Sequence, residues 1–295
     1  MSNRYLDPEG LARVGNMELV ARQVVEGFLT GRHRSPYHGF SVEYLDHRAY
    51  TPGDDLRSID WKILARTDKY HVKLFEDETN LRAYVLLDCS KSMAFQSGAV
   101  SKLAYGSYLA AALTYLMLHQ NDAVGLVLFD SEVRQFLTPR ARPTQFRRVL
   151  ELLDNPTPRE DTDVGVVLHD VAERIKRRGL VIVISDLIDD EAKVANGLQH
   201  FRHNNHEVIV FHVMDDAELN FPYDRLTRFK DMEGSGRVVA NPKNLRTRYL
   251  ARIQTFLETL QTACFERGVS YNLANTREPY DQFLAAYLEK RARMG

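Results

Sequence analysis

The chain has 295 residues, of which 44% are hydrophobic and 27% charged, a composition that fits a globular protein and excludes a disordered, collagen-like or coiled-coil chain. Lysine and arginine number 39 against 40 acidic residues, giving a net charge of −1, and this balance argues against a general nucleic-acid binder, which needs a basic excess. The two cysteines, Cys89 and Cys264, exclude a disulfide framework and favour a reducing compartment.

No segment resembles a targeting signal or a membrane anchor. The first ten residues carry Arg4, Asp7 and Glu9 and lack the apolar core of a secretion signal. The most apolar stretch, residues 103–118, includes Gly106 and other small or polar residues and falls short of the roughly 20 apolar residues that span a bilayer. We therefore expect a cytoplasmic protein without stable membrane insertion.

Residues 1–80 are predicted as an N-terminal helix followed by an irregular segment. Apolar residues recur at helical spacing over residues 9–30, and Gly31 marks a stop. Residues 31–61 contain many glycines, prolines, histidines and paired charges, which indicate loops and short strands. A structureless segment of that length is uncommon unless it is functional or packs as a layer of its own.

Over residues 81–295, short apolar strands alternate with helices. Strands are predicted at 82–88, 123–129, 132–137 (an edge strand), 180–185, 207–214 and 269–273, and helices at 99–119, 143–154, 162–178, 190–204, 246–267 and 279–293. Strands rich in Val, Ile and Leu between helices are typical of a mostly parallel sheet covered on both faces. We therefore predict a doubly wound α/β domain with a β-hairpin inserted at about residues 216–242, around Gly234-Ser235-Gly236.

Oxygen donors occur where these strands end. Asp88 closes the first strand, Ser90 and Ser92 follow it, Thr162 begins a helix, and Asp186 follows the 180–185 strand. Ligands of open α/β sheets bind beyond the carboxyl ends of the strands, and hard oxygen ligands suit Mg²⁺ or Mn²⁺ better than Zn²⁺. The pattern predicts one divalent cation site that prefers Mg²⁺. The negative charges of the two carboxylates would nearly cancel the charge of the ion.

Two other interpretations of these residues are weaker. Ser and Asp are good helix N-caps, and Asp88 alone would favour simple capping, but Thr162 and Asp186 stand at matching loop positions. A phosphotransferase of the haloacid dehalogenase kind also begins with Asp after a strand. That motif needs a second acid two residues on, where this chain has Ser90.

The spacing D-x-S-x-S with a distant Thr and Asp resembles the metal-ion-dependent adhesion site (MIDAS) of von Willebrand factor A (VWA) domains, with Asp88, Ser90 and Ser92 on the first loop, Thr162 on the second and Asp186 on the third. The front segment extends the likeness, because GRHRSPYHGFSVEY, DHRAYTPGDDLRSIDWKILART and VKLFEDE are similar to the DUF58 family of VWA-like proteins. The resemblance covers roughly residues 20–280, and the motifs together are specific, whereas D-x-S-x-S alone is a weak signal.

This resemblance implies a non-enzymatic adaptor. VWA domains are mostly binding modules, in which a partner's carboxylate completes the coordination of the metal. DUF58 proteins are associated with AAA+ ATPases of the MoxR type in chaperone-like assembly or maturation of protein complexes. The expected partner is such an ATPase or its client, with no nucleic acid, and the front segment and the hairpin would add a second surface for specificity. One alternative is a Mg²⁺-dependent hydrolase or phosphatase, but the sequence shows no evident nucleophile or base near the ligands. The other is a VWA scaffold that binds no metal.

A charged cluster precedes the α/β domain. We favour a salt-bridged structural network or a partner surface there, with the tryptophan packed beneath it, over a catalytic site, because no nucleophile–base pair stands beside it. Its members are Asp54, Asp55, Arg57, Asp60, Trp61 and Arg66.

Three smaller features favour structural roles. His200, His203 and His206 lie near a predicted helix end, and we favour cations or caps over zinc because no Cys or carboxylate joins them at a known ligand spacing. The basic residues 32–34 fit a solvated loop better than a phosphate site. Cys89 is predicted to be a small buried residue.

Overall fold

The computed structural model describes residues 41–49, 61–67, 70–78, 81–154, 156, 158, 163–230 and 236–293. The contacts divide the chain into two units, of which one is Tyr37–Leu81 and the other combines Met1–Pro36 with Arg82–Gly295. The helix predicted at residues 9–30 lies outside the described residues.

The described residues of the smaller unit form an antiparallel strand pair and a helix. Strand β1 (Ser41–Ala49) pairs with β2 (His71–Glu78), and the register shifts between Tyr44 and Asp46. Helix α3 (Trp61–Thr67) lies between the two strands in the sequence. Part of the segment predicted as loops and short strands is thus a nine-residue strand, whose partner lies more than twenty residues further along the chain.

A six-stranded sheet forms the centre of the larger unit. Its strands lie in the order β10-β7-β6-β3-β4-β5, and every neighbouring pair is parallel except β4 with β5. The bounds are β3 (Arg82–Asp88), β4 (Ala123–Phe129), β5 (Val133–Arg140), β6 (Leu180–Ser185), β7 (Glu207–Met214) and β10 (Ser270–Asn275). The four interior strands are buried over almost their whole length, as expected for parallel strands that are covered on both faces.

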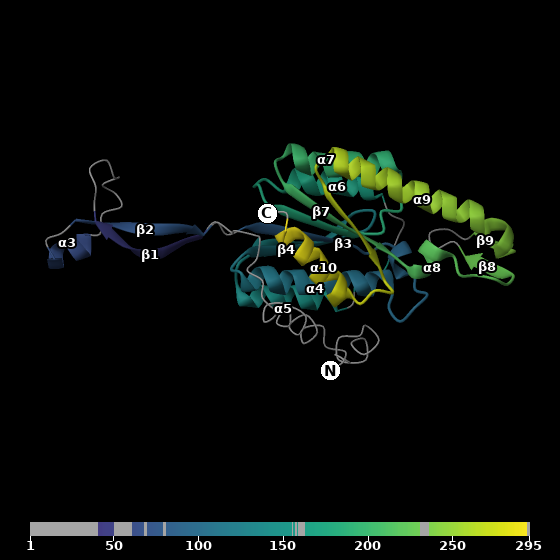
Figure 1. Cartoon of the computed structure of the whole chain (residues 1–295), viewed down its shortest axis with the longest axis horizontal. Coiled ribbons are helices and arrows are strands. Elements are labelled where there is room, and N and C mark those ends of the chain that lie inside the picture. Colours follow the sequence, from purple (N-terminus) through teal and green to yellow (C-terminus); the bar gives the residue numbers. More distant parts are fainter. Residues whose placement is uncertain are drawn as a thin grey trace. The chain divides into compact units, whose positions relative to one another are not determined.

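Helices cover the two faces of this sheet (Figure 1). On one face lie α6 (Val164–Arg174), α7 (Glu191–His203) and α9 (Pro242–Glu266), and on the other lie α4 (Lys102–His119), α5 (Pro143–Leu153) and α10 (Tyr280–Ala292). The predicted class, a doubly wound, mostly parallel α/β fold, is therefore confirmed. Among the described helices, none combines the length and the apolar character that a membrane crossing requires.

Helix α4 lies directly on the middle of the sheet because Gly106 permits a close approach. A Cβ atom at Gly106 would be 2.9 Å from Cδ1 of Leu87 on β3 and 3.1 Å from Cγ2 of Ile184 on β6. Ser101 caps the helix by accepting a hydrogen bond from the Ala104 N–H at 3.1 Å. Because α4 follows β3, its first turn, with Lys102, lies at the carboxyl end of the sheet.

The predicted hairpin is present as an antiparallel pair, β8 (Thr227–Lys230) with β9 (Arg237–Ala240). It follows a short helix that the sequence pattern did not predict, α8 (Asp216–Asn220), which begins with a capping box formed by Asp215 and Glu218. An aromatic cluster ties this insertion to α9. Its members are Phe221, Tyr223, Phe229 and Tyr249, and the rings of Phe221 and Tyr249 have centroids 4.5 Å apart.

Candidate functional site

Two neighbouring strands bring the predicted ligands together at the carboxyl edge of the sheet. Strand β3 ends at Asp88 and β6 ends at Ser185, directly before Asp186, and these two strands are hydrogen-bonded neighbours. From β3 the chain continues to β4 on one side, and from β6 it continues to β7 on the other. This is a topological switch point, where open α/β sheets leave a crevice for ligands.

Asp88 is fully buried, and both of its carboxylate oxygens accept hydrogen bonds. Oδ1 accepts the Ser90 N–H at 2.8 Å, and Oδ2 accepts the Ser185 hydroxyl at 2.6 Å. Burial, and then the nearby Asp186 carboxylate, raise the pKa of Asp88 to about 7. The two aspartates are thus close enough to repel each other, and the site disfavours two uncompensated negative charges.

The serines of the first loop face each other. The hydroxyls of Ser90 and Ser92 share a hydrogen bond of 2.9 Å, and both residues are buried. A short 3-10 helix, η2 (Ser92–Ala94), begins at the second serine. The first-loop residues Asp88, Ser90 and Ser92 therefore form one buried group of oxygen donors, as the D-x-S-x-S spacing predicted.

Thr162, the remaining predicted ligand, lies outside the described residues. The next residue, Asp163, caps α6 and accepts a hydrogen bond from the Val166 N–H at 3.4 Å. Two residues further on, Gly165 donates its backbone N–H to the Asp189 carboxylate at 3.2 Å. Asp189 lies in the loop three residues after Asp186. The start of α6 is therefore fixed to the loop that follows β6.

A buried lysine, which the sequence analysis did not single out, binds the second aspartate. The Lys102 ammonium on α4 lies 2.7 Å from Asp186 Oδ2 and 2.8 Å from Glu218 Oε1 on α8. Burial alone would lower the pKa of Lys102, but the two carboxylates more than offset this and raise it. Lys102 therefore stays charged, although its side chain has 0% exposure. The only sequence signal was a single cation in the first turn of an otherwise apolar helix.

The loop after β7 adds further acidic groups to this edge. Asp215 is fully buried and accepts hydrogen bonds from both the backbone N–H and the hydroxyl of Ser97, as well as from the Ala217 N–H. Burial raises the pKa of Glu218, and the Lys102 ammonium opposes that effect. Three successive strand ends, of β3, β6 and β7, thus each supply a buried aspartate.

A pocket lies beside this cluster. Its lining includes Ile188, two residues after Asp186, together with Glu218 and the α9 side chains Tyr249, Arg252 and Phe256. Arg252 lies 3.5 Å from Glu191, at the start of α7. A ligand at the carboxyl edge would therefore meet both an apolar wall and one arginine.

The donor set fits a hard divalent cation. It consists of carboxylates and hydroxyls, the groups that Mg²⁺ and Mn²⁺ prefer. When Asp88, Asp186, Asp215 and Glu218 are all ionised, the single positive charge of Lys102 offsets only part of their negative charge, and a divalent ion would offset more of it. Lys102 already binds one carboxylate oxygen of Asp186. An ion would therefore bind the other oxygen of Asp186, or a remaining lone pair of the first.

Among the described residues near these aspartates, neither Cys89 nor His212 is prepared to act as a nucleophile or base. Burial raises the pKa of the Cys89 thiol to about 12, so the thiol stays protonated. Burial lowers the pKa of His212 to about 4, and its Nδ1 shares a 2.6 Å hydrogen bond with the Tyr271 hydroxyl. Cys89 is fully enclosed, which confirms that it is a small buried residue.

The charged cluster ahead of the α/β domain is only partly described. Asp54, Asp55, Arg57 and Asp60 lie outside the described residues. Trp61 is the first residue of α3 and is 62% exposed, and Arg66 is an exposed residue in the last turn of that helix. Most of the Trp61 side chain thus faces solvent, and the salt-bridged network, with four members outside the described residues, stays a prediction.

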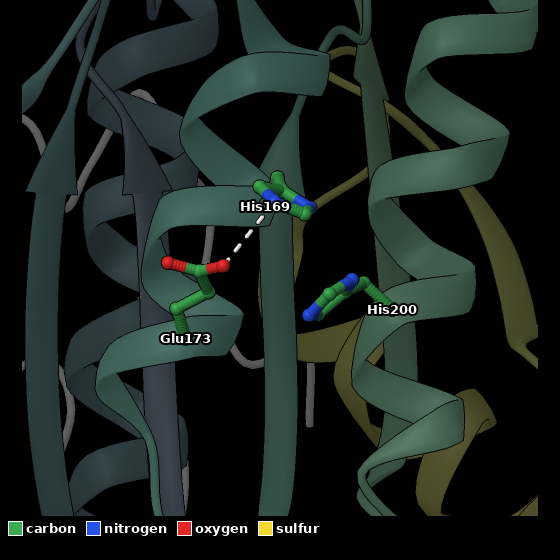
Figure 2. Close-up of side chains that lie close together, drawn as sticks. All are labelled: His169, Glu173 and His200. Carbon is green, nitrogen blue, oxygen red and sulfur yellow. Dashed lines mark ion pairs between the residues drawn. The ribbon is translucent and has the colours of Figure 1, made fainter.

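The three histidines near the end of α7 do not form one group. His206 is buried after the helix, where its Nδ1 accepts the Gly179 N–H at 3.2 Å, whereas His203 bonds to Gln199. His200 instead faces α6, where it lies beside His169 and Glu173 (Figure 2). Side chains at the end of a helix point in different directions, so the sequence spacing of these histidines did not show which residues each one contacts.

The fold and the acidic strand ends define an α/β protein with a candidate cation-binding site at a topological switch point. A family model described as "Protein of unknown function DUF58" matches residues 46–256, and the chain belongs to this DUF58 family. An uncharacterized protein of Mycobacterium tuberculosis, Rv1480, is 26% identical over 222 residues, which cover 73% of this chain and 68% of the relative.

One solved structure shares the fold at low sequence identity, and a second is similar to a lesser degree. An aerotolerance-related membrane protein from Bacteroides fragilis superposes with a TM-score of 0.51 at 15% identity, covering 73% of this chain and all of that one. The SpRpn10 VWA domain matches with a TM-score of 0.41 at 11% identity, covering 70% of this chain and 94% of that one. The first of these likenesses supports the α/β fold that the sheet itself defines.

Proposed function

We propose that this DUF58 protein is a non-enzymatic adaptor that binds a partner protein through a divalent cation, Mg²⁺ first and Mn²⁺ second. The observation that carries the proposal is the convergence of buried oxygen donors at the switch point between β3 and β6. Asp88 and Asp186 would supply charge, and Ser90 and Ser92 would supply hydroxyl ligands. Thr162 completes the proposed set on the basis of the VWA-like motif.

Each residue has a distinct part in this proposal. Ser185 fixes one oxygen of Asp88 through its 2.6 Å hydrogen bond, which orients the carboxylate. Lys102 holds Asp186 and limits the negative charge of the site. The bound ion would supply an open coordination position for an acidic side chain of the partner, so partner binding and ion binding are coupled.

We infer from the DUF58 resemblance that the partner is a MoxR-type AAA+ ATPase or its client complex, and that the pair assists assembly or maturation of protein complexes. A cytoplasmic setting suits the two free thiols of Cys89 and Cys264, both of which are buried. The exposed apolar side chains Val238 and Val239 on β9 offer a second contact for specificity.

Titration calorimetry with MgCl₂ tests the ion. We expect saturable binding to the wild-type chain and at least a tenfold weaker affinity for Asp88→Asn, because one of the two anionic ligands loses its charge. Asp154→Asn is the matched control, since that aspartate is exposed at the end of α5. Equal titration of both variants would contradict the proposed site. Absence of binding to the wild type would favour a metal-free scaffold, in which Lys102 alone provides the compensating charge.

Mixing the purified chain with the MoxR-type ATPase from the same cells tests the partner. A chelator would also remove the Mg²⁺ of bound ATP, so the Asp88→Asn variant is the cleaner probe. We expect the wild type and Asp154→Asn to co-elute with the ATPase, and Asp88→Asn to lose most of the complex. Undiminished complex formation by Asp88→Asn would contradict a metal-bridged contact.

A further inference from the structure

Two histidines and a glutamate meet across two helices, away from the carboxyl edge of the sheet. His169 and Glu173 lie one turn apart on α6, and His200 lies opposite them on α7 (Figure 2). We propose that these three side chains form a second metal site, selective for a zinc-class transition metal. It is independent of the proposed Mg²⁺ site in its residues and in its ligand chemistry.

The geometry needs only small side-chain rotations to bind an ion. The candidate ligand atoms lie within 4.8 Å of one another. His169 Nε2 is 3.5 Å from Glu173 Oε1, and the rings of His169 and His200 have centroids 4.3 Å apart at 70° to each other. Tetrahedral zinc with bonds of about 2.0–2.1 Å places its ligand atoms about 3.4 Å apart. One pair already has that separation.

Two glycines hold the helices at the distance that the site requires. A Cβ atom at Gly165 would lie 2.6 Å from Lys193 Cβ, and one at Gly197 would lie 2.9 Å from Leu168 Cβ. The helices thus approach within backbone contact one turn before His169 and His200. Side chains on the next turn of each helix are brought face to face on a rigid frame, and a preorganised frame lowers the entropic cost of binding.

The surroundings leave room for a fourth ligand. A surface pocket beside the cluster is lined by Glu173, Lys176, His200 and Asn204, among others. The nearby Arg174 is occupied by Asp170, with a contact of 2.7 Å. Two neutral imidazoles and one carboxylate carry a charge of −1, so a bound divalent ion leaves +1 and keeps a position open for water or for an anionic side chain.

The ligand types distinguish this site from the one at the strand ends. Imidazole nitrogen suits Zn²⁺, Co²⁺ and Ni²⁺, whereas Mg²⁺ requires oxygen ligands. Two histidines with one carboxylate are the donor set of several zinc centres that keep an open position. The bound ion would cross-link α6 and α7, which cover the same face of the sheet (Figure 1).

Cobalt absorption and zinc calorimetry test the proposal on the full chain. Both are carried out in the Asp88→Asn background, so that ions at the proposed Mg²⁺ site contribute less to the signal. We expect Co²⁺ to give the intense visible bands of a tetrahedral site, abolished by excess Zn²⁺. We expect His200→Ala to weaken Zn²⁺ binding at least tenfold. His203→Ala is the matched control, because His203 is an exposed histidine three residues further along the same helix.

The outcomes are distinct. Loss of binding in His200→Ala and His169→Ala, with retention in His203→Ala, supports the site. Equal Zn²⁺ affinity in His200→Ala and His203→Ala overturns it and leaves His169 and Glu173 as a simple ion pair. Circular dichroism of each variant verifies that the fold is retained. Failure of the Mg²⁺ proposal would leave these results unaffected, since His169, Glu173 and His200 share no residue with that site and all variants are compared in the same Asp88→Asn background.

Discussion

Lys102 offsets part of the negative charge of the candidate site. Its ammonium is enclosed between Asp186 and Glu218, at 2.7 and 2.8 Å, with no solvent exposure. A cation in the first turn of a helix is unfavourable with respect to the helix dipole, so its position is explained by the two carboxylates. The fold thus contains its own partial counter-charge for the acidic strand ends.

Replacing Lys102 by Met leaves two carboxylates without their cation. Removal of one partner of a buried ion pair costs about 3–5 kcal/mol, so we expect a fall of that order in the free energy of unfolding measured in urea. We also expect Mg²⁺ to recover part of the loss, because a ligand that binds the folded state stabilises it.

Lys193→Met is the control for this experiment. Lys193 is 56% exposed and lies 3.8 Å from Asp163, and substitutions at such surface positions change stability by less than about 0.5 kcal/mol. If Lys102→Met were as stable as Lys193→Met, the ammonium would have no part in holding the strand ends together.

Interior strands were predictable from the sequence, and edge strands were less so. The observed β3, β4, β6 and β7 coincide with the predicted ranges 82–88, 123–129, 180–185 and 207–214, because strands buried on both faces are continuous apolar runs. The edge strand β5 extends to Arg140 rather than ending at 137. Its exposed face carries polar residues, so the apolar pattern ends before the hydrogen bonding does.

Helix α9 begins earlier than predicted, and a missed cap explains the difference. The apolar pattern placed its start at residue 246, whereas it begins at Pro242. Asn241 accepts a hydrogen bond from the Lys243 N–H at 3.1 Å, and proline is well suited to the first turn. The Asn-Pro pair was the available signal. Helix α8 is only five residues long, too short for a periodic pattern.

The candidate site was predictable only in part, because some of its residues are positioned by strand ends and others by contacts between segments far apart in the sequence. Asp88 and Asp186 could be found because parallel strands deliver their carboxyl ends to one edge. Lys102 and Glu218 could not be paired from the sequence, since their contact spans 116 residues and depends on how α4 lies on the sheet. The meeting of His169 with His200 likewise depends on the packing of α6 against α7.

Gly165 sets the spacing between α6 and α7, and its substitution by alanine tests this. Helix propensity alone predicts that alanine stabilises by about 1 kcal/mol. The added Cβ would lie 2.6 Å from Lys193 Cβ and 2.8 Å from the Lys193 backbone carbon, and overpacking of this kind costs about 1–3 kcal/mol. We expect a net loss of thermal stability, measured as a lower Tm. Gly98→Ala is the control, since nothing lies within 4 Å of its added Cβ, and an unchanged Tm for Gly165→Ala would contradict the close approach.

For the whole molecule, the distribution of charge matters more than its sum. The net charge is −1, yet the carboxyl edge of the sheet gathers the buried Asp88, Asp186 and Asp215 with Glu218, and Lys102 pairs with two of these four acids. A near-neutral total therefore conceals a strongly negative site. The second unit, Tyr37–Leu81, falls largely within the region that the DUF58 model matches, so family membership concerns both units.

An adaptor should lack hydrolytic activity even when its ion is present. We expect the purified chain with Mg²⁺ or Mn²⁺ to hydrolyse p-nitrophenyl phosphate no faster than Asp88→Asn does. The physical reason is that Cys89 stays protonated, His212 stays neutral and bonded to Tyr271, and Lys102 stays charged. Metal-dependent turnover that Asp88→Asn abolishes would instead identify a phosphatase and overturn the adaptor proposal.

The strand order also determines when the site can form during synthesis. The central strand β3 is bonded on one side to β4 and on the other to β6, and the hydrogen bond from Ser185 to Asp88 joins residues 97 positions apart. Domains fold as their sequence emerges from the ribosome, so a nascent chain that ends before β6 leaves Asp88 at an open sheet edge, without its neighbour. The acidic pair can therefore assemble only after translation has passed Asp186, and the proposed ion could not bind before β3, β4, β5 and β6 exist.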